Sequence, residues 1–179
     1  MPHEPRPILA ARHPVHITAR VCDAAAALRT QECFRLVLNA IGAVRAREGF
    51  RVVHFTIQNN HLHAIVEASE ASGLARGVQA LLIRIARAVN RVLGRSGKVF
   101  TERYHAHVLK TPTEVANAVA YVLWNSTVHA ARKGREVRWD AVDQLSSAAN
   151  SYYVAQPRTW LLRMGWMWGR RVDTSSPND

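Results

Sequence analysis

The stretch "RVVHFTIQNNHLHAIVEA", residues 51–68, decides the fold because it holds two strands and the turn between them. Residues 51–57 and 61–68 are rich in apolar and β-branched side chains, as strands are. The polar residues 58–60 between them are typical of a tight turn. The two strands are therefore predicted to pair as an antiparallel hairpin.

The second strand of this hairpin carries two histidines on one face. Side chains alternate along a strand, so His61 and His63 point the same way, whereas Leu62, Ala64 and Val66 point toward a core. Two neutral imidazoles side by side can hold a divalent metal ion. The plainer interpretation, which an isolated His-x-His pair favours, is two polar residues on the wet side of a half-covered sheet.

The periodicity of the rest of the chain predicts the remaining elements. They are a strand at 13–21, a helix at 28–48, a helix at 71–94, a fourth strand within 96–110 and a helix from 111 to Gly134. With the hairpin, this order is β-α-β-β-α-β followed by one more helix. It predicts an α+β, ferredoxin-like fold, in which two helices cover one face of an antiparallel sheet. We expect a catalytic domain over 1–135 and an aromatic, basic tail over 136–179.

The balance of charge indicates a polyanionic partner. The chain of 179 residues has 24 Lys and Arg against 13 Asp and Glu, a formal net charge of +11. Such a field attracts nucleic acid. A GC-rich genome would explain the preference for arginine over lysine, but not the excess of basic over acidic residues. The chain lacks an apolar run of the roughly 18 residues that a membrane helix needs.

The start of the chain lacks the apolar segment of a secretory signal, and its two cysteines form no metal or redox motif. We therefore expect a bacterial cytoplasmic protein that associates with the nucleoid and not with a membrane.

The last predicted helix carries a second pair of polar residues. Thr111, Pro112 and Glu114 are typical of a capped helix start. Further along, Tyr121 and Asn125 are four residues apart and therefore share one helical face. A helix that follows the fourth strand can cover the sheet face left open by the first two helices. A phenol and an amide would then approach the two imidazoles.

This set of groups has a chemical logic. A metal ion on two imidazoles and an amide oxygen keeps positions for a phosphate oxygen and water, and acts as a Lewis acid on a phosphodiester. Attack by Tyr121 would leave a 5′-phosphotyrosine and a free 3′-hydroxyl. Tyr104, next to His105 and His107, is the rival nucleophile. A zinc hydrolase that uses water is another possibility, but it usually has a third histidine or a carboxylate ligand.

Two stretches resemble a known family. "NNHLHAIVE" (59–67) looks like the His-hydrophobic-His motif of single-tyrosine HUH transposases, and "RYHAHVLKTPTEVANAVAYVLWN" (103–125) looks like their nucleophile helix with the strand before it. The nearest group is the REP-associated tyrosine transposases, relatives of the insertion-sequence-200-like transposases. The resemblance covers about 13–168, and "RTWLLRMGW" (158–166) resembles the C-terminus of one bacterial subgroup.

The resemblance implies a role for each matching residue. His61 and His63 would bind the metal ion, Mg²⁺ or Mn²⁺, with Asn125 as third ligand and Tyr121 as nucleophile. The family cleaves and rejoins single-stranded DNA beside small hairpins. Ser126 stands where relatives often have proline. This difference leaves Asn125, the expected third ligand, in place. The long tail favours a monomer over a homodimer.

The basic residues predicted to contact DNA form two groups. They are Arg84, Arg87, Arg91 and Arg95 on the helix at 71–94, and Arg103, Lys110, Arg132 and Lys133 near the helix that carries Tyr121. In the tail, the tryptophans can stack unpaired bases, but for Trp160 docking on the core with the leucines that follow it is preferred. Glu67 is expected to be solvated. The alternative function is a non-catalytic, ferredoxin-like nucleic-acid-binding protein that keeps the basic surface.

Overall fold

The computed structural model describes residues 9–132 and 142–169, and for residues 125–132 it describes the backbone alone. Its strands are β1 (Val15–Arg20), β2 (Ala46–Arg47), β3 (Phe50–Ile57), β4 (His61–Ala68) and β5 (His105–Val108). Its α-helices are α1 (Gln31–Val44), α2 (Ala71–Val92), α3 (Pro112–Arg132) and α4 (Trp160–Arg163), and single 3₁₀ turns are η1 (Asp23–Ala25), η2 (Ser151–Tyr153) and η3 (Gly165–Trp168). None of the helices in these residues is long and apolar enough to span a bilayer.

The five strands form one sheet in the order β2-β3-β4-β1-β5, and every neighbouring pair is antiparallel. The hairpin of β3 and β4 lies beside β1, and β5 closes the other edge. With α1 and α2 as crossovers, this is the predicted α+β, ferredoxin-like fold. The extra strand, β2, is a two-residue addition at the outer edge of β3.

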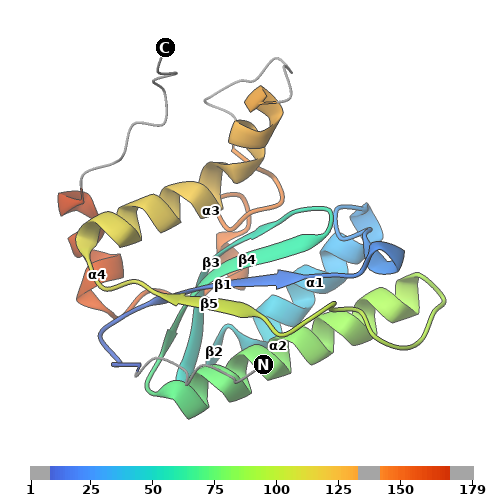
Figure 1. Cartoon of the computed structure of the whole chain (residues 1–179), viewed down its shortest axis with the longest axis horizontal. Coiled ribbons are helices and arrows are strands. Elements are labelled where there is room, and N and C mark those ends of the chain that lie inside the picture. The colour runs from blue at the N-terminus through green and yellow to red at the C-terminus, as the bar shows by residue number, and fades with distance from the viewer. Residues whose placement is uncertain (1–8, 133–141, 170–179) are drawn as a thin grey trace, which may run out of the picture.

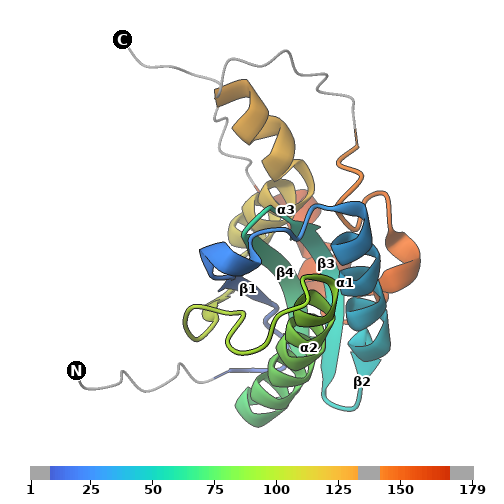
Figure 2. The ribbon, with the colours of Figure 1, turned by 90° about the vertical axis from the view of Figure 1, so that its right-hand side faces the viewer.

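Helices cover both faces of the sheet (Figures 1 and 2). On one face, α1 and α2 pack on a core that includes Ile17, Phe55 and Leu81. On the other face, α3 and α4 pack on a smaller core around Ile65. The interpretation of a half-covered sheet is therefore wrong at β4, which is buried along nearly its whole length.

Glu67 shows the consequence of this second layer. Its side chain is only 6% exposed, so the expectation that it is solvated is wrong. Its carboxylate accepts hydrogen bonds from the backbone N–H groups of Arg158, at 3.0 and 2.9 Å, and of Thr159, at 2.7 Å. Arg51 lies 3.8 Å away. Glu67 thus attaches the start of α4 to the sheet.

The element bounds differ from the predicted ones mainly at the ends. α1 is shorter than the predicted 28–48, because Thr30 is its N-cap residue and the chain enters β2 directly after the helix. β5 covers four residues of the predicted 96–110, and Phe100 makes an isolated bridge to Val21 instead. Gly134, the predicted helix end, lies outside the described residues.

The segment that begins at Val142 runs along the free edge of β3. Ile57 donates its backbone N–H to Leu145 and Phe55 accepts from Ser147, both at 2.9 Å. Ala155 then donates to Val52 at 2.8 Å. The boundary expected between 135 and 136 lies outside the described residues, so the division into a domain and a tail stays a prediction.

Candidate active site

The start of α3 is fixed by a capping box. The hydroxyl of Thr111 accepts from the N–H of Glu114 at 3.2 Å, and one carboxylate oxygen of Glu114 accepts from the N–H groups of Lys110 and Thr111 at 2.8 Å each. Burial raises the pKa of Glu114, but these hydrogen bonds outweigh it and lower the pKa below its ordinary value. The helix therefore begins where the sequence predicts.

The apolar stripe of α3 sets its rotation over the sheet. Val115, Val119 and Val122 are buried in the same cluster as Ile65 of β4. Because successive helix positions are about 100° apart, this packing turns Tyr121 toward the β1 side of the helix. Tyr121 stays 44% exposed, so the residue is open to solvent on this flank of α3.

The rings of four side chains meet beneath this flank of α3. His61 and His63 lie nearly parallel, with ring centroids 6.0 Å apart. The ring of Tyr121 stands edge-on to His63 at 5.2 Å and to His16 at 5.8 Å. His16 and His63 are 5.6 Å apart. The predicted nucleophile and the predicted imidazole pair are thus brought together.

The two predicted ligands are oriented as metal-binding histidines usually are. Nδ1 of His63 lies 3.1 Å from the hydroxyl oxygen of Thr18, and Nδ1 of His61 lies 2.8 Å from the amide oxygen of Asn60. In metal sites, such a contact at one ring nitrogen fixes the ring while the other nitrogen ligates. Burial, with the charge of Arg20 in second place, lowers the pKa of His61. This favours the neutral ring that metals need.

The imidazoles of His61 and His63 can hold a metal ion only if oxygen ligands complete its coordination. Among the described residues, no three His, Cys, Asp or Glu side chains are grouped to hold a metal ion by themselves. An amide, a phosphate oxygen or water would have to complete the coordination. Asn125 lies in α3 four residues beyond Tyr121, but its side chain is outside the described part, so its role as ligand stays a prediction.

Sequence reasoning missed some of the residues that surround His61, His63 and Tyr121. It did not single out Thr18 and Arg20 on the first strand. In the register of β1 on β4, Thr18 lies opposite His63 and Arg20 opposite His61. In a ferredoxin-like sheet the first and third main strands are neighbours, so the alternation of β1 was the available signal.

His16 is held in its neutral form. Burial, followed by the nearby His107 and His105, lowers the pKa of His16 to about 4. Its Nε2 atom is buried and has no hydrogen-bond partner among the residues that the structure describes. The ring adds an uncharged polar group next to Tyr121.

Tyr104, the rival nucleophile, is directed elsewhere. It packs against the core beneath α1 and α2, on the face opposite Tyr121. His105 and His107, its sequence neighbours, are exposed and pair in register with Thr18 and His16. The sheet therefore separates Tyr104 from the imidazoles expected to activate it.

The predicted DNA-contacting residues fall on both sides of the molecule. Arg84, Arg87 and Arg91 line a groove between α1 and α2, on the side of the sheet away from Tyr121. Arg95 donates to the carbonyl of Lys98 at 3.1 Å and so holds a loop. The others are Arg103 and Lys110, exposed on either side of β5, and Arg132 and Lys133, whose side chains are not described.

The tail residues also differ from expectation. Trp160 is 59% exposed, so its expected docking on the core is wrong, whereas the two leucines after it are buried. Trp166 packs partly against the core beneath α3, and Trp168 is exposed.

Comparisons with known proteins show likeness at the level of structure. No protein-family model matches the chain, and no curated protein matches its sequence. The structure of a REP-associated tyrosine transposase bound to a REP hairpin has a TM-score of 0.53 and 16% identity, covering 72% of this chain and 74% of that chain. A bacterial tRNA(His) guanylyltransferase (Thg1)-like protein in complex with GTP has a TM-score of 0.52 and 10% identity, covering 74% and 70%.

At these identities the likeness extends to the fold alone, and two proteins with different chemistry share it. The chain is an α+β protein with the ferredoxin-like fold of that transposase and that guanylyltransferase-like protein.

Proposed function

We propose that this chain is a metal-dependent, single-stranded DNA endonuclease and strand transferase, a transposase of the single-tyrosine HUH type with Tyr121 as nucleophile. The observation that carries the proposal is the position of Tyr121, on a helix far away in sequence, with its ring centroid 5.2 Å from that of His63. The likeness to the REP-associated transposase structure supports it at the level of fold. The sequence resemblance supports it residue by residue.

The polar groups of the sheet favour this chemistry over nucleotidyl transfer. Two-metal phosphoryl transfer commonly relies on carboxylate ligands. Within the described chain, Glu67 is the one acidic residue on the five strands, and it is already bound to the backbone of the segment before α4. The face beneath α3 therefore offers imidazoles, which suit a metal-assisted attack by a side chain.

The chemical step follows from the placement of the phenol. The Tyr121 oxygen attacks phosphorus, the bond from phosphorus to the 3′-oxygen breaks, and the 5′-phosphate stays on the tyrosine. The phenol gives up its proton to solvent and the departing 3′-oxygen takes one up. Mg²⁺ or Mn²⁺ held by His61, His63 and Asn125 would supply Lewis-acid stabilisation of the phosphate charge. Imidazole ligands suit Mn²⁺ better.

The partner in this proposal is single-stranded or hairpin DNA. The REP-associated tyrosine transposase with the similar fold is bound to a REP hairpin, and the net charge of +11 on this chain supports an anionic partner. Attack by a second 3′-hydroxyl on the phosphotyrosine would rejoin strands, since the phosphodiester energy is retained. We expect a monomer that acts at the bacterial nucleoid.

The test is a search for the covalent intermediate. Protein is mixed with Mn²⁺ and a pool of labelled single strands that each carry a hairpin flanked by randomised nucleotides, and denaturing gels reveal protein–DNA adducts. We expect an adduct that disappears in Tyr121→Phe and falls strongly in His61→Ala and His63→Ala. Tyr104→Phe is the matched control and keeps it.

Two other results would overturn the proposal. Retention of DNA without any adduct indicates the non-catalytic binding protein. Cleavage that survives Tyr121→Phe indicates a hydrolase that uses water.

A further inference from the structure

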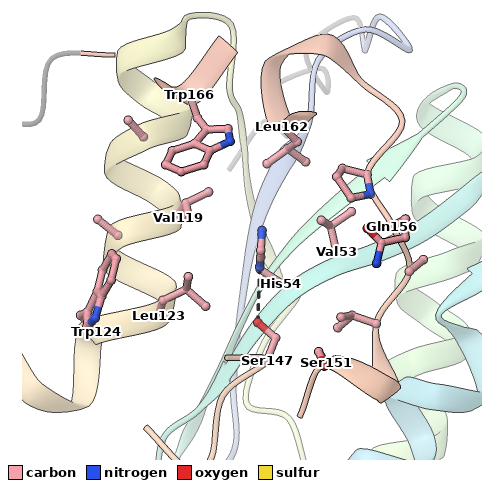
Figure 3. Close-up of a pocket in the computed structure, with 15 residues that line it drawn as sticks. Val53, His54, Val119, Leu123, Trp124, Ser147, Ser151, Gln156, Leu162 and Trp166 are labelled. Carbon is pink, nitrogen blue, oxygen red and sulfur yellow. Dashed lines mark hydrogen bonds between the residues drawn. The ribbon is translucent and has the colours of Figure 1, made fainter. Parts of the chain in front are cut away.

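A cavity of ≈ 380 Å³ lies on the same side of the sheet as Tyr121, between α3, β3 and the segment that leads into α4 and η3 (Figure 3). The α3 residues that line it are Ala116, Val119, Ala120, Leu123 and Trp124. Tyr121 is not among them, because it lies on the other flank of the helix. The cavity and the candidate active site are thus separated by the width of α3.

The cavity combines apolar walls with polar groups. Trp166, Leu162 and Val119 form its walls, and Trp124 lies at its edge (Figure 3). The imidazole of His54 points into it from β3, with Nδ1 3.4 Å from the hydroxyl oxygen of Ser147. Further lining comes from the hydroxyl of Ser151 and the amide of Gln156.

The lining carries no formal charge. None of the described residues around the cavity is Lys, Arg, Asp or Glu. The titratable group among them is His54, and burial, opposed by Glu67, lowers its pKa to about 4, so the ring is neutral near pH 7. In a chain of net charge +11, an uncharged cavity is not suited to phosphate or to a metal ion. It suits a flat, neutral ring with hydrogen-bonding edges.

The position of Trp124 connects the cavity to the reaction. It follows Tyr121 by three residues, about one helical turn, and it is partly exposed. A strand whose phosphodiester lies at Tyr121 can cross α3 and reach the cavity within a few nucleotides, because the helix is about 10 Å wide.

We propose that this cavity receives one unpaired nucleobase of the DNA strand. The base would stack on an indole and meet the hydrogen-bonding groups of His54 and Gln156. The inference deepens the proposed function and rests on it, because the strand is the one cleaved at Tyr121. The site would make cleavage depend on a base at a fixed distance from the scissile phosphate.

The experiment compares DNA with and without bases. Binding of fluorescent single strands of about twelve nucleotides, enough to cover one single-strand binding site, is measured by anisotropy. The strands are oligo-dA, oligo-dC, oligo-dT and an abasic strand of equal length. The protein carries Tyr121→Phe throughout, so that binding is read without chemistry. Ala120→Leu fills the cavity, and Trp124→Ala removes its aromatic edge.

We expect each variant to bind at least one base-containing strand about tenfold more weakly and to bind the abasic strand as before, because stacking of one base contributes roughly 1–3 kcal/mol. Unchanged abasic binding also shows that the variant is folded. Trp168→Ala, an exposed tryptophan away from the cavity, is the matched control and should bind every strand normally.

Equal affinities of the Tyr121→Phe protein with and without Ala120→Leu for all base-containing strands would overturn the cavity site. So would equal losses on the abasic strand. This result is separable from the fate of the proposed function: an adduct at Tyr121 without any base-dependent loss refutes the cavity site alone. A base-dependent loss without any adduct keeps the site and refutes the chemistry.

Discussion

Two ionisable residues, the buried Glu67 and the half-buried His54, contribute to how the layer of α3 and α4 is attached to the sheet. Both lie on the face beneath α3, where the polar side of a sheet would normally be wet. Glu67 is stabilised by three backbone hydrogen bonds and by Arg51, whereas His54 is kept neutral. A buried carboxylate with these partners cannot lose one without a large cost.

Neutralising Glu67 should loosen the segment before α4. We expect Glu67→Gln to lower the free energy of unfolding by about 2–3 kcal/mol, because charge-assisted hydrogen bonds are lost in a buried site. Urea denaturation followed by circular dichroism measures it. Glu70→Gln is the matched control, since Glu70 is exposed and its ion pair with Arg76 lies in solvent; it should change stability by less than about 0.5 kcal/mol. Similar losses in both variants would refute the assigned role.

The neutral state of His54 predicts an acid sensitivity. The pKa of His54 is about 4 in the folded chain against an ordinary value of 6.5, so the unfolded chain takes up the proton first. The contribution of the neutral His54 ring to the free energy of unfolding is complete above pH 6.5 and is lost as the pH falls toward 4. We expect His54→Gln to remove about 2 kcal/mol of the stability difference between about pH 7 and about pH 5.

The check is denaturation at both pH values, with His13→Gln as a control that keeps the wild-type difference. If His54→Gln has the same pH dependence as the wild type, His54 is not the group responsible.

At the scale of elements, α3 is the one that assembles the site, and its start and its rotation are set separately. The capping box fixes where the helix begins, and the valine stripe fixes which flank carries Tyr121. Both signals are local, so the sequence alone could predict them.

Breaking the capping box should therefore weaken the helix start. We expect Thr111→Ala to lower the free energy of unfolding by about 1 kcal/mol, the usual effect of a lost N-cap. Thr113→Ala, two residues into the same turn, is the control and should have a smaller effect. The measurement is again urea denaturation, and an equal loss in the two variants would argue against the cap.

The sequence predicted the order of the elements, the hairpin, and the position of His61 and His63 on one face of a strand. Each of these depends on a period of two or of about 3.6 residues. It did not predict that Glu67 is buried, since its partners lie 91 and 92 residues away in a segment without periodicity. Thr18 and Arg20 were missed for a related reason. Their role appears only when strand order is combined with alternation.

For the whole molecule, the sheet separates two basic surfaces. Arg20 is exposed opposite His61 in the sheet, and Lys110 is exposed beside the capping box at the start of α3. Arg84 and Arg87 are exposed between α1 and α2. If chemistry takes place at Tyr121, the substrate strand must lie on the first side. Counterion release then gives a way to tell the sides apart.

We expect the double variant Arg20→Gln/Lys110→Gln to reduce the slope of log affinity against log salt by about 1.4 for single-stranded DNA, which is about 0.7 for each phosphate that the protein no longer neutralises. Arg84→Gln/Arg87→Gln removes the same charge from the opposite side and should change the slope less. Anisotropy titrations at several salt concentrations measure both, and a larger effect of the second pair would place the strand on the α2 side.

The backbone ladder between β3 and the residues near Leu145 and Ala155 has a consequence for shortened forms of the protein. Without that segment, the donors and acceptors of Val52, Phe55 and Ile57 would form an unprotected strand edge beside a strip of apolar side chains. A chain cut before Val142 should therefore tend to self-associate edge to edge into insoluble β-rich material.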